Sequence, residues 1–170
     1  AADGAYQFAD VPFDASYQYV VTAAHSGVMF VSEIITVDPA QTEIRLPVTI
    51  YETGAPESVI LISTISTQLM VQNDVLQAIQ IVSFINTSDQ VYYNADEESA
   101  TSVHLNLPQN ASLLSSVSSR NTLSEDGRQI YSTRPVMPGE TYIMHLAYSM
   151  PYEQPVSIDQ VLDYPLDGNV

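Results

Sequence analysis

The sequence predicts an all-β protein built from two β-sandwich units. Short runs that alternate apolar with polar residues recur along the chain, and many are rich in Tyr, Val, Ile and Thr, the residues favoured in strands. Turn-forming Gly, Pro, Asn and Asp separate these runs at roughly the 8–12 residue spacing of β-sandwiches. No stretch has a persuasive helical period. We therefore expect about a dozen strands and no helix.

The first fifty residues supply the strands of the first unit. A turn at Ser26-Gly27 lies between two strand-like runs, which predicts a β-hairpin. The run before residue 52 alternates over Ile44, Leu46, Val48 and Ile50. The strands expected here cover residues 6–11, 17–22, 28–31, 34–37 and 43–51.

A segment with Gly, Pro and charge at 52–57 is typical of a linker, so we expect domains at 1–51 and 58–170. Residues 75–85 are long enough for a helix, but dense β-branched residues favour a strand. In the last expected strand, every second residue from Tyr142 to Met150 is apolar. The strands expected in this half cover residues 59–65 and 68–71, both buried, and 75–85, 103–107, 129–131 and 141–150.

Charge excludes several classes of partner. The 170 residues contain 20 acids and 4 bases, all arginine, for a net charge of −16. Nucleic acids and anionic membranes need a basic surface, so neither is expected as a partner. The chain has no cysteine, and no apolar run reaches the roughly 18 residues of a membrane span. We therefore expect no disulfide, no thiolate chemistry and no membrane insertion within this segment.

The N-terminal residues carry a pattern known from one family. A glycine turn is followed by Tyr-x-Phe, Val-Pro and a Tyr-x-Val strand, formed here by Gly4, Tyr6, Phe8, Val11, Pro12, Tyr19 and Val21. Over residues 1–50 the sequence resembles the carboxypeptidase regulatory-like domain, a small β-sandwich of secreted and surface proteins. The resemblance implies an accessory module without catalysis. It also implies that the opening strands of the first sandwich are missing, since the family's domain has strands before this turn.

The remaining chain is similar to the β-sandwich domain that often follows in bacterial surface proteins. The similarity rests on the turn after Phe84-Ile85 and on Pro138-Gly139-Glu140 before a Tyr-rich strand. The chain opens on a turn motif without a signal-peptide pattern. We therefore interpret the sequence as a piece of a longer precursor.

Catalytic and metal-binding patterns are weak. His25, His104 and His145 show no i,i+4 spacing, although His104 and His145 could meet across a sheet. Ordinary polar-face histidines are the expected outcome. There is no Gly-x-Ser-x-Gly elbow and no phosphate-binding glycine loop. We therefore predict no enzyme, no catalytic residue and no bound cofactor.

Calcium is the metal ion that the acidic loops of the sequence could bind. Asp96-Glu97-Glu98 is expected to be a solvated loop, with a calcium site as the alternative. Residues 125–127 and 163–169 are equally explained as turns.

Two further kinds of surface site are indicated. Asn86 and Asn110 begin Asn-x-Ser sequons at turns, which makes them possible glycosylation sites, although chance sequons are expected in a Ser- and Thr-rich chain. Tyr92 and Tyr93 are the best candidates for exposed aromatics that bind sugar, because a consecutive pair in a strand points both ways.

Together these features favour a non-enzymatic extracellular structural protein at the cell surface. We expect a subunit of a bacterial surface assembly or filament, a homopolymer in which strands from outside residues 1–170 complete residues 1–50. These strands come either from upstream sequence of the same polypeptide or from a neighbouring subunit, and we favour the neighbouring subunit. Residues 156–162 or 164–170 of a neighbouring subunit are the expected donors. The alternative is a surface module that binds carbohydrate or a protein partner.

Overall fold

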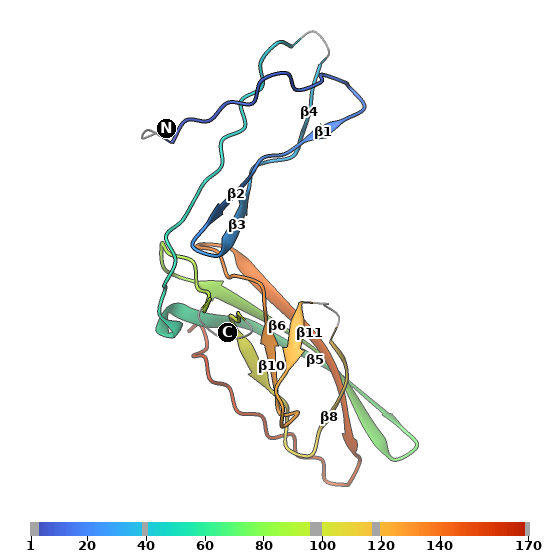
Figure 1. Cartoon of the computed structure of the whole chain (residues 1–170). Coiled ribbons are helices and arrows are strands. Elements are labelled where there is room, and N and C mark those ends of the chain that lie inside the picture. Colours follow the sequence, from blue (N-terminus) through green and yellow to red (C-terminus); the bar gives the residue numbers. More distant parts are fainter. Residues whose placement is uncertain (1–3, 39–40, 96–99, 117–119, 169–170) are drawn as a thin grey trace. The chain divides into compact units, whose positions relative to one another are not determined.

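The computed structural model describes residues 4–38, 41–95, 100–116 and 120–168. In this part of the chain the regular structure is β, apart from one turn of 3-10 helix, η1 (Glu57–Val59), so the prediction of an all-β fold is confirmed (Figure 1). The chain divides into two compact units, residues 1–50 and 51–170. Each unit is described by itself.

Within the residues described, four short strands form unit 1 and seven form unit 2. The strands of unit 1 are β1 (Gln18–Tyr19), β2 (Thr22–His25), β3 (Val28–Val31) and β4 (Ile35–Thr36). Those of unit 2 are β5 (Ile60–Gln72), β6 (Val75–Asn86), β7 (His104–Asn106), β8 (Ser112–Ser116), β9 (Asn121–Leu123), β10 (Gln129–Ser132) and β11 (Thr141–Pro151).

Unit 1 consists of two separate antiparallel pairs, β2–β3 and β1–β4. The predicted turn joins β2 to β3, and its residues Ser26 and Gly27 both have positive φ angles, 48° and 77°. This tight turn sets the hairpin register, so Thr22 pairs with Val31. The expected strand 17–22 is divided into two. Gln18 and Tyr19 form β1, which pairs with β4, whereas Thr22 begins β2, which pairs with β3. The expected strands 6–11 and 43–51 belong to no ladder among the described residues.

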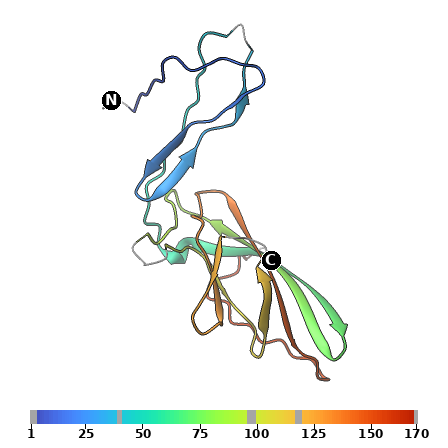
Figure 2. The ribbon, with the colours of Figure 1, turned by 45° about the vertical axis from the view of Figure 1, so that its right-hand side comes forward.

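Unit 2 is a two-layer β-sandwich. One layer is an antiparallel sheet of order β5-β6-β11-β8, and the other is an antiparallel sheet of order β7-β10-β9 (Figure 2). The ambiguous run 75–85 is a strand, as predicted. It pairs along its length with β11, from Val75 opposite Pro151 to Ile85 opposite Thr141.

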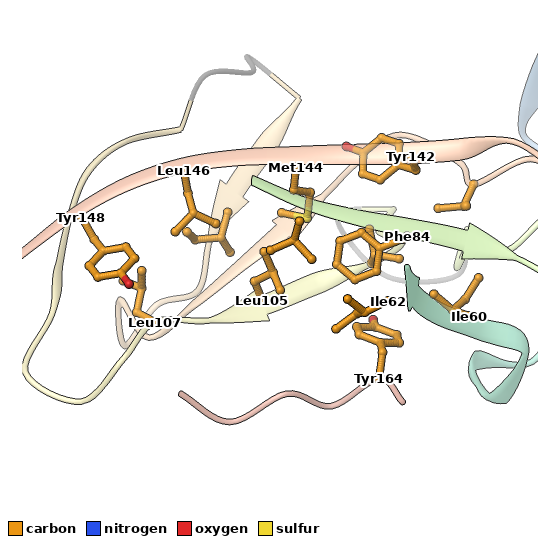
Figure 3. Packing of buried hydrophobic residues seen from close by; sticks show 14 of the residues in the cluster. Ile60, Ile62, Phe84, Leu105, Leu107, Tyr142, Met144, Leu146, Tyr148 and Tyr164 are labelled. Carbon is orange, nitrogen blue, oxygen red and sulfur yellow. The ribbon is translucent and has the colours of Figure 1, made fainter. Parts of the chain in front are cut away.

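Alternation along the strands directs the apolar side chains between the two layers. Tyr142, Met144, Leu146 and Tyr148 are buried on one face of β11, as predicted from the sequence. Figure 3 shows Met144 facing Leu105 and Tyr148 beside Leu107 of the second layer, with Tyr142 beside Phe84. Because both faces contribute to one cluster, the two sheets share a single core.

The β5–β6 hairpin corrects a detail of the prediction. Residues 59–65 and 68–71 were expected as two buried strands, but they form one strand with an irregularity between Ile62 and Thr64. Beyond it, Leu69, Met70 and Val71 are exposed. In Figure 1 this end of the hairpin extends away from β10. This run has the composition of a strand, but in the described residues the second layer does not cover this end.

The expected linker at 52–57 is part of unit 2. The Val91 N–H donates to the Glu52 carbonyl at 2.8 Å, and the Val91 carbonyl accepts from the N–H groups of Gly54 and Ala55 at 3.2 Å. Glu57 begins η1. Backbone pairing therefore holds within unit 2 a segment whose composition is typical of a linker.

Candidate functional site

The C-terminal residues close one side of unit 2. Tyr164 is buried, and the backbone after it pairs with β5: the Ile62 N–H donates to the Pro165 carbonyl and the Asp167 N–H donates to the Ile62 carbonyl, each at 2.8 Å. Leu166 forms a parallel bridge with Ile62. The expectation that residues 164–170 serve as a donor strand is therefore wrong for residues 164–167, which complete their own domain.

The other expected donor, 156–162, is also held within its own unit. Gln160 and the buried Gln80 form a reciprocal amide pair, with nitrogen–oxygen distances of 2.8 and 3.1 Å. The Gln160 amide also donates to the Asn106 carbonyl at 2.7 Å. Releasing this segment would leave the Gln80 amide buried without that partner, which disfavours donation to a neighbour.

A cleft of about 660 Å³ lies between β7 and residues 156–167, the C-terminal segment. Leu107, Ile158 and Val161 supply its apolar wall. Its polar residues are Asn106, Gln109, Arg128, Asp159, Gln160 and Asp163. The volume falls within the range of small-molecule sites.

Structural contacts occupy part of the polar lining. The Arg128 guanidinium donates to the carbonyls of Leu107, Pro108 and Ala111 at 2.9–3.4 Å, so it fixes the loop after β7. The Gln109 side chain and the Asp159 carboxylate lie at the exposed surface of the cleft. They are therefore the groups best placed to meet a ligand.

His104 stands beside the cleft in a chain of hydrogen bonds. Its Nε2 lies 2.9 Å from an Asp163 carboxylate oxygen, and its Nδ1 lies 2.9 Å from the Tyr164 hydroxyl. Asn106 donates to the same Asp163 oxygen. Burial, with a smaller contribution from nearby Tyr92, raises the pKa of the Tyr164 phenol, so this hydroxyl stays protonated in the folded protein.

This Asp-His-Tyr chain has the connectivity of a catalytic relay but lacks its geometry. In a relay the third group must reach a substrate, whereas Tyr164 is only 2% exposed and packs edge-on against Phe84. The cluster therefore fastens the C-terminal segment to β7. Sequence analysis missed it because His104 and Asp163 are 59 residues apart and no local motif links them.

His104 and His145, which the sequence allowed to meet across a sheet, do not do so. His104 lies on β7 and His145 on β11, in different sheets, and His145 faces away from the core opposite Ile81. In the described part of the chain, no three His, Asp or Glu side chains are grouped to hold a metal ion. Residues 96–98, the first calcium candidate, lie outside the described residues.

The turn at Asp126 is explained without calcium. One Asp126 carboxylate oxygen accepts from the Ser124 hydroxyl at 2.6 Å and from the Arg128 N–H at 3.0 Å. These bonds, the Ser124 one first, lower the pKa of Asp126. This side chain stabilises its own turn.

Calcium removal is expected to leave the thermal melting temperature unchanged. The reason is that Asp126 accepts hydrogen bonds within its own turn, and the described residues contain no group of three His, Asp or Glu side chains that could hold a metal ion. Thermal melts followed by circular dichroism in calcium and in a chelator test this, with magnesium as the control for ionic strength. A melting temperature that falls on chelation of calcium alone would contradict it.

The two sequons differ in accessibility. Asn110 is exposed at a turn with a φ angle of 63°, as expected for a sequon on a loop. Asn86 is 2% exposed, and its amide nitrogen donates to the carbonyls of Gln90 and Val136 at 2.7 and 3.0 Å. The expectation that Asn86 can carry a glycan is therefore wrong for the folded protein, because the attachment atom is buried and bonded.

Asn86→Asp is expected to destabilise unit 2 by about 1–3 kcal/mol at neutral pH, because it sets a carboxylate against two carbonyl oxygens. Burial and these oxygens raise the pKa of the new carboxyl above its unfolded value. The loss should therefore shrink as the pH falls and the group becomes protonated. Urea melts at pH 7 and pH 5 measure this, with exposed Asn110→Asp as control. An equal loss at both pH values would contradict the buried contact.

The aromatic pair is less exposed than predicted. Tyr92 and Tyr93 are both half-buried, and Tyr92 packs against the core of unit 2. Tyr92 also bridges to Val136 through its backbone. The expected exposed binding pair is therefore wrong for Tyr92, and Tyr93 is half-buried.

Comparisons with known proteins found no relative. No family model, curated protein or solved structure matches the chain. In the ranges that the structure describes, there is no helix long and apolar enough to span a membrane. The resemblance to the carboxypeptidase regulatory-like domain stays a prediction.

Proposed function

We propose that the chain is a non-enzymatic, extracellular structural subunit of a bacterial cell-surface assembly, in which unit 1 is completed by a strand from a neighbouring copy. The observation that supports this is the open state of unit 1. Two segments, 6–13 and 43–50, lie outside any ladder in the described residues, and 6–13 bends at Asp10, whose φ angle is 58°. Backbone without ladder partners is a template for another strand.

The exposed apolar side chains of unit 1 also support association with a second copy. Nine of its large apolar side chains are at least 39% exposed: Tyr6, Phe8, Val11, Tyr17, Val20, Met29, Val31, Ile34 and Ile50. Burying a large apolar side chain contributes about 1.5–3 kcal/mol, so covering even a few of them favours association.

Segment 6–13 of a second copy is the donor that fits. In its own unit it touches 43–50 through a hydrogen bond from the Tyr6 hydroxyl to the Leu46 carbonyl. Segment 43–50 alternates, with Ile44, Leu46 and Val48 half-buried. Exchange of an identical segment between copies is a low-cost route to an assembly.

Assembly is tested by sedimentation and negative-stain microscopy of the full chain over a dilution series. Phe8→Ser should weaken the association, while Val161→Ser in unit 2 should leave it unchanged; both side chains are 68% exposed. Hydrogen exchange should show the amides of 43–50 unprotected in the dilute chain and protected in the assembly. A chain that stays monomeric throughout, or equal effects of the two variants, would overturn the proposal.

The cleft supports a second candidate, a module that binds carbohydrate. Amide and carboxylate groups beside apolar side chains suit the hydroxyls and C–H faces of a sugar. A glycan screen tests this, and Asp159→Ala should abolish any binding found. The control, Glu140→Ala, removes one exposed carboxylate elsewhere in unit 2. No hit, or an equal loss in both variants, would count against the cleft.

A further inference from the structure

The outer edge of β5 is open over most of its length. β5 is the first strand of its sheet, and β6 covers only its inner edge. At Ile62 the outer edge is taken by the C-terminal segment. From Thr64 to Gln72, no other strand or backbone hydrogen bond of the described chain reaches it. Nine residues of unpaired edge remain, bounded by the C-terminal segment and by the turn at Asn73–Asp74.

This edge lacks the features that normally protect one. Residues 60–72 contain no charged residue and no proline, although the whole chain carries a net charge of −16. Exposed edges are usually blocked by charge, proline or covering segments. A second acidic copy can approach this edge without placing carboxylates opposite each other. Elsewhere on the surface, the net negative charge of both copies opposes such an approach.

We infer that β5 pairs antiparallel with β5 of a second copy about a two-fold axis at Gln68, joining the two four-stranded sheets into one. An antiparallel pair about such an axis keeps the two core faces on the same side. Centring it at Gln68 uses the whole open edge, since Thr64 then lies opposite Gln72 of the other copy.

The edge is self-complementary in this register. Positions 65, 67, 69 and 71 lie on the core face, opposite the buried Val82, Gln80, Ala78 and Leu76 of β6. About the axis, Ile65 lies opposite Val71, and Thr67 opposite Leu69. On the outer face, Gln68 meets Gln68 of the other copy and Ser66 meets Met70. β-Branched and apolar cross-strand pairs stabilise such ladders, and no like charges face each other.

The absence of native cysteine makes the register directly testable in the full chain. Gln68→Cys should form a disulfide-linked dimer under mild oxidation, because the paired Cβ atoms would be about 4.5–5.5 Å apart. Ser66→Cys and Met70→Cys should not cross-link alone, since each would lie about 13 Å from its own copy along the strand. Mixed together, these two variants should cross-link with each other.

Ile79→Cys is the matched control, because Ile79 is exposed opposite Gln68 but on the inner strand β6. It should not cross-link. Equal cross-linking at 66, 68, 70 and 79, or none at any of them, would overturn the proposal. Cross-linking of Ser66→Cys with itself but not with Met70→Cys would also overturn this register.

Charge at the axis provides a second measurement. Gln68→Glu places two carboxylates opposite each other and should raise the dimer dissociation constant by about tenfold or more. Ser115→Glu adds the same charge to β8, the opposite edge of the sheet, and should have little effect. Unchanged sedimentation of Gln68→Glu would contradict the interface. This inference does not rest on the proposed function: Phe8→Ser tests unit 1, whereas the cysteine variants report on β5 alone.

Discussion

Replacing Phe84 with alanine is expected to lower the free energy of unfolding of unit 2 by about 3–5 kcal/mol. Phe84 is fully buried on β6, and its ring lies 6.5 Å from Tyr142 and 5.4 Å from Tyr164. Removing it leaves a cavity between the two sheets and the C-terminal segment, which a β-sandwich cannot fill without moving strands. Urea unfolding followed by tyrosine fluorescence measures the loss.

Ile143→Ala is the matched control. Ile143 lies on β11 opposite Ser83, the neighbour of Phe84, but it faces outward and is 48% exposed. Its truncation should change stability by about 0.5 kcal/mol or less. Comparable losses for the two variants would mean that Phe84 does not occupy the core of unit 2.

Tyr164→Ala is expected to cost about 3–5 kcal/mol and to detach the C-terminal segment. Tyr164 fills a core position beside Phe84, and its hydroxyl bonds to the ring and the backbone N–H of His104. Tyr164→Phe keeps the ring but leaves those His104 groups unpaired, which should cost about 1–3 kcal/mol. Hydrogen exchange of residues 158–167 should rise more in the alanine variant.

The burial of Tyr164 also predicts that unit 2 loses stability at alkaline pH. Because burial raises the pKa of Tyr164 above its ordinary value of 10.0, the unfolded chain loses this proton at a lower pH than the folded protein. The stabilisation is complete below pH 10 and declines as the pH rises above it. Stability measured from pH 8 to 11 should fall less steeply for Tyr164→Phe than for wild type. Tyr152→Ala, a half-buried residue of the same segment, should follow wild type; identical slopes for all three would contradict this origin.

The alternation of apolar and polar residues predicted where strands lie, but not which segments pair with them or cover them. Alternation identified β6 and the buried face of β11, because side-chain burial in a strand has a period of two whatever the pairing. It failed at Leu69–Val71, which has strand composition but no layer above it. It also failed at 52–57, because the pairing with Val91 depends on a residue more than thirty positions away.

The candidate site could not be predicted for the same reason. Asp163 and Gln160 stand in a segment without regular structure, so no periodicity marks which side chain turns inward. Their partners His104 and Gln80 are 59 and 80 residues away. Asn86 shows the converse: a sequon is a local pattern, whereas its use requires an accessible amide, which only the packed structure decides.

The late position of Tyr164 and Gln160 in the chain has a consequence for biosynthesis. All strands of the sandwich leave the ribosome before the segment that closes its core. Until residues 160–167 emerge, Phe84 lacks its edge-on ring and the Gln80 amide lacks its reciprocal partner. The nascent unit therefore keeps an open apolar side available to chaperones. A translation product that stops before Gln160 carries all the strands that the structure describes, yet it remains recognisable to quality control as unfinished.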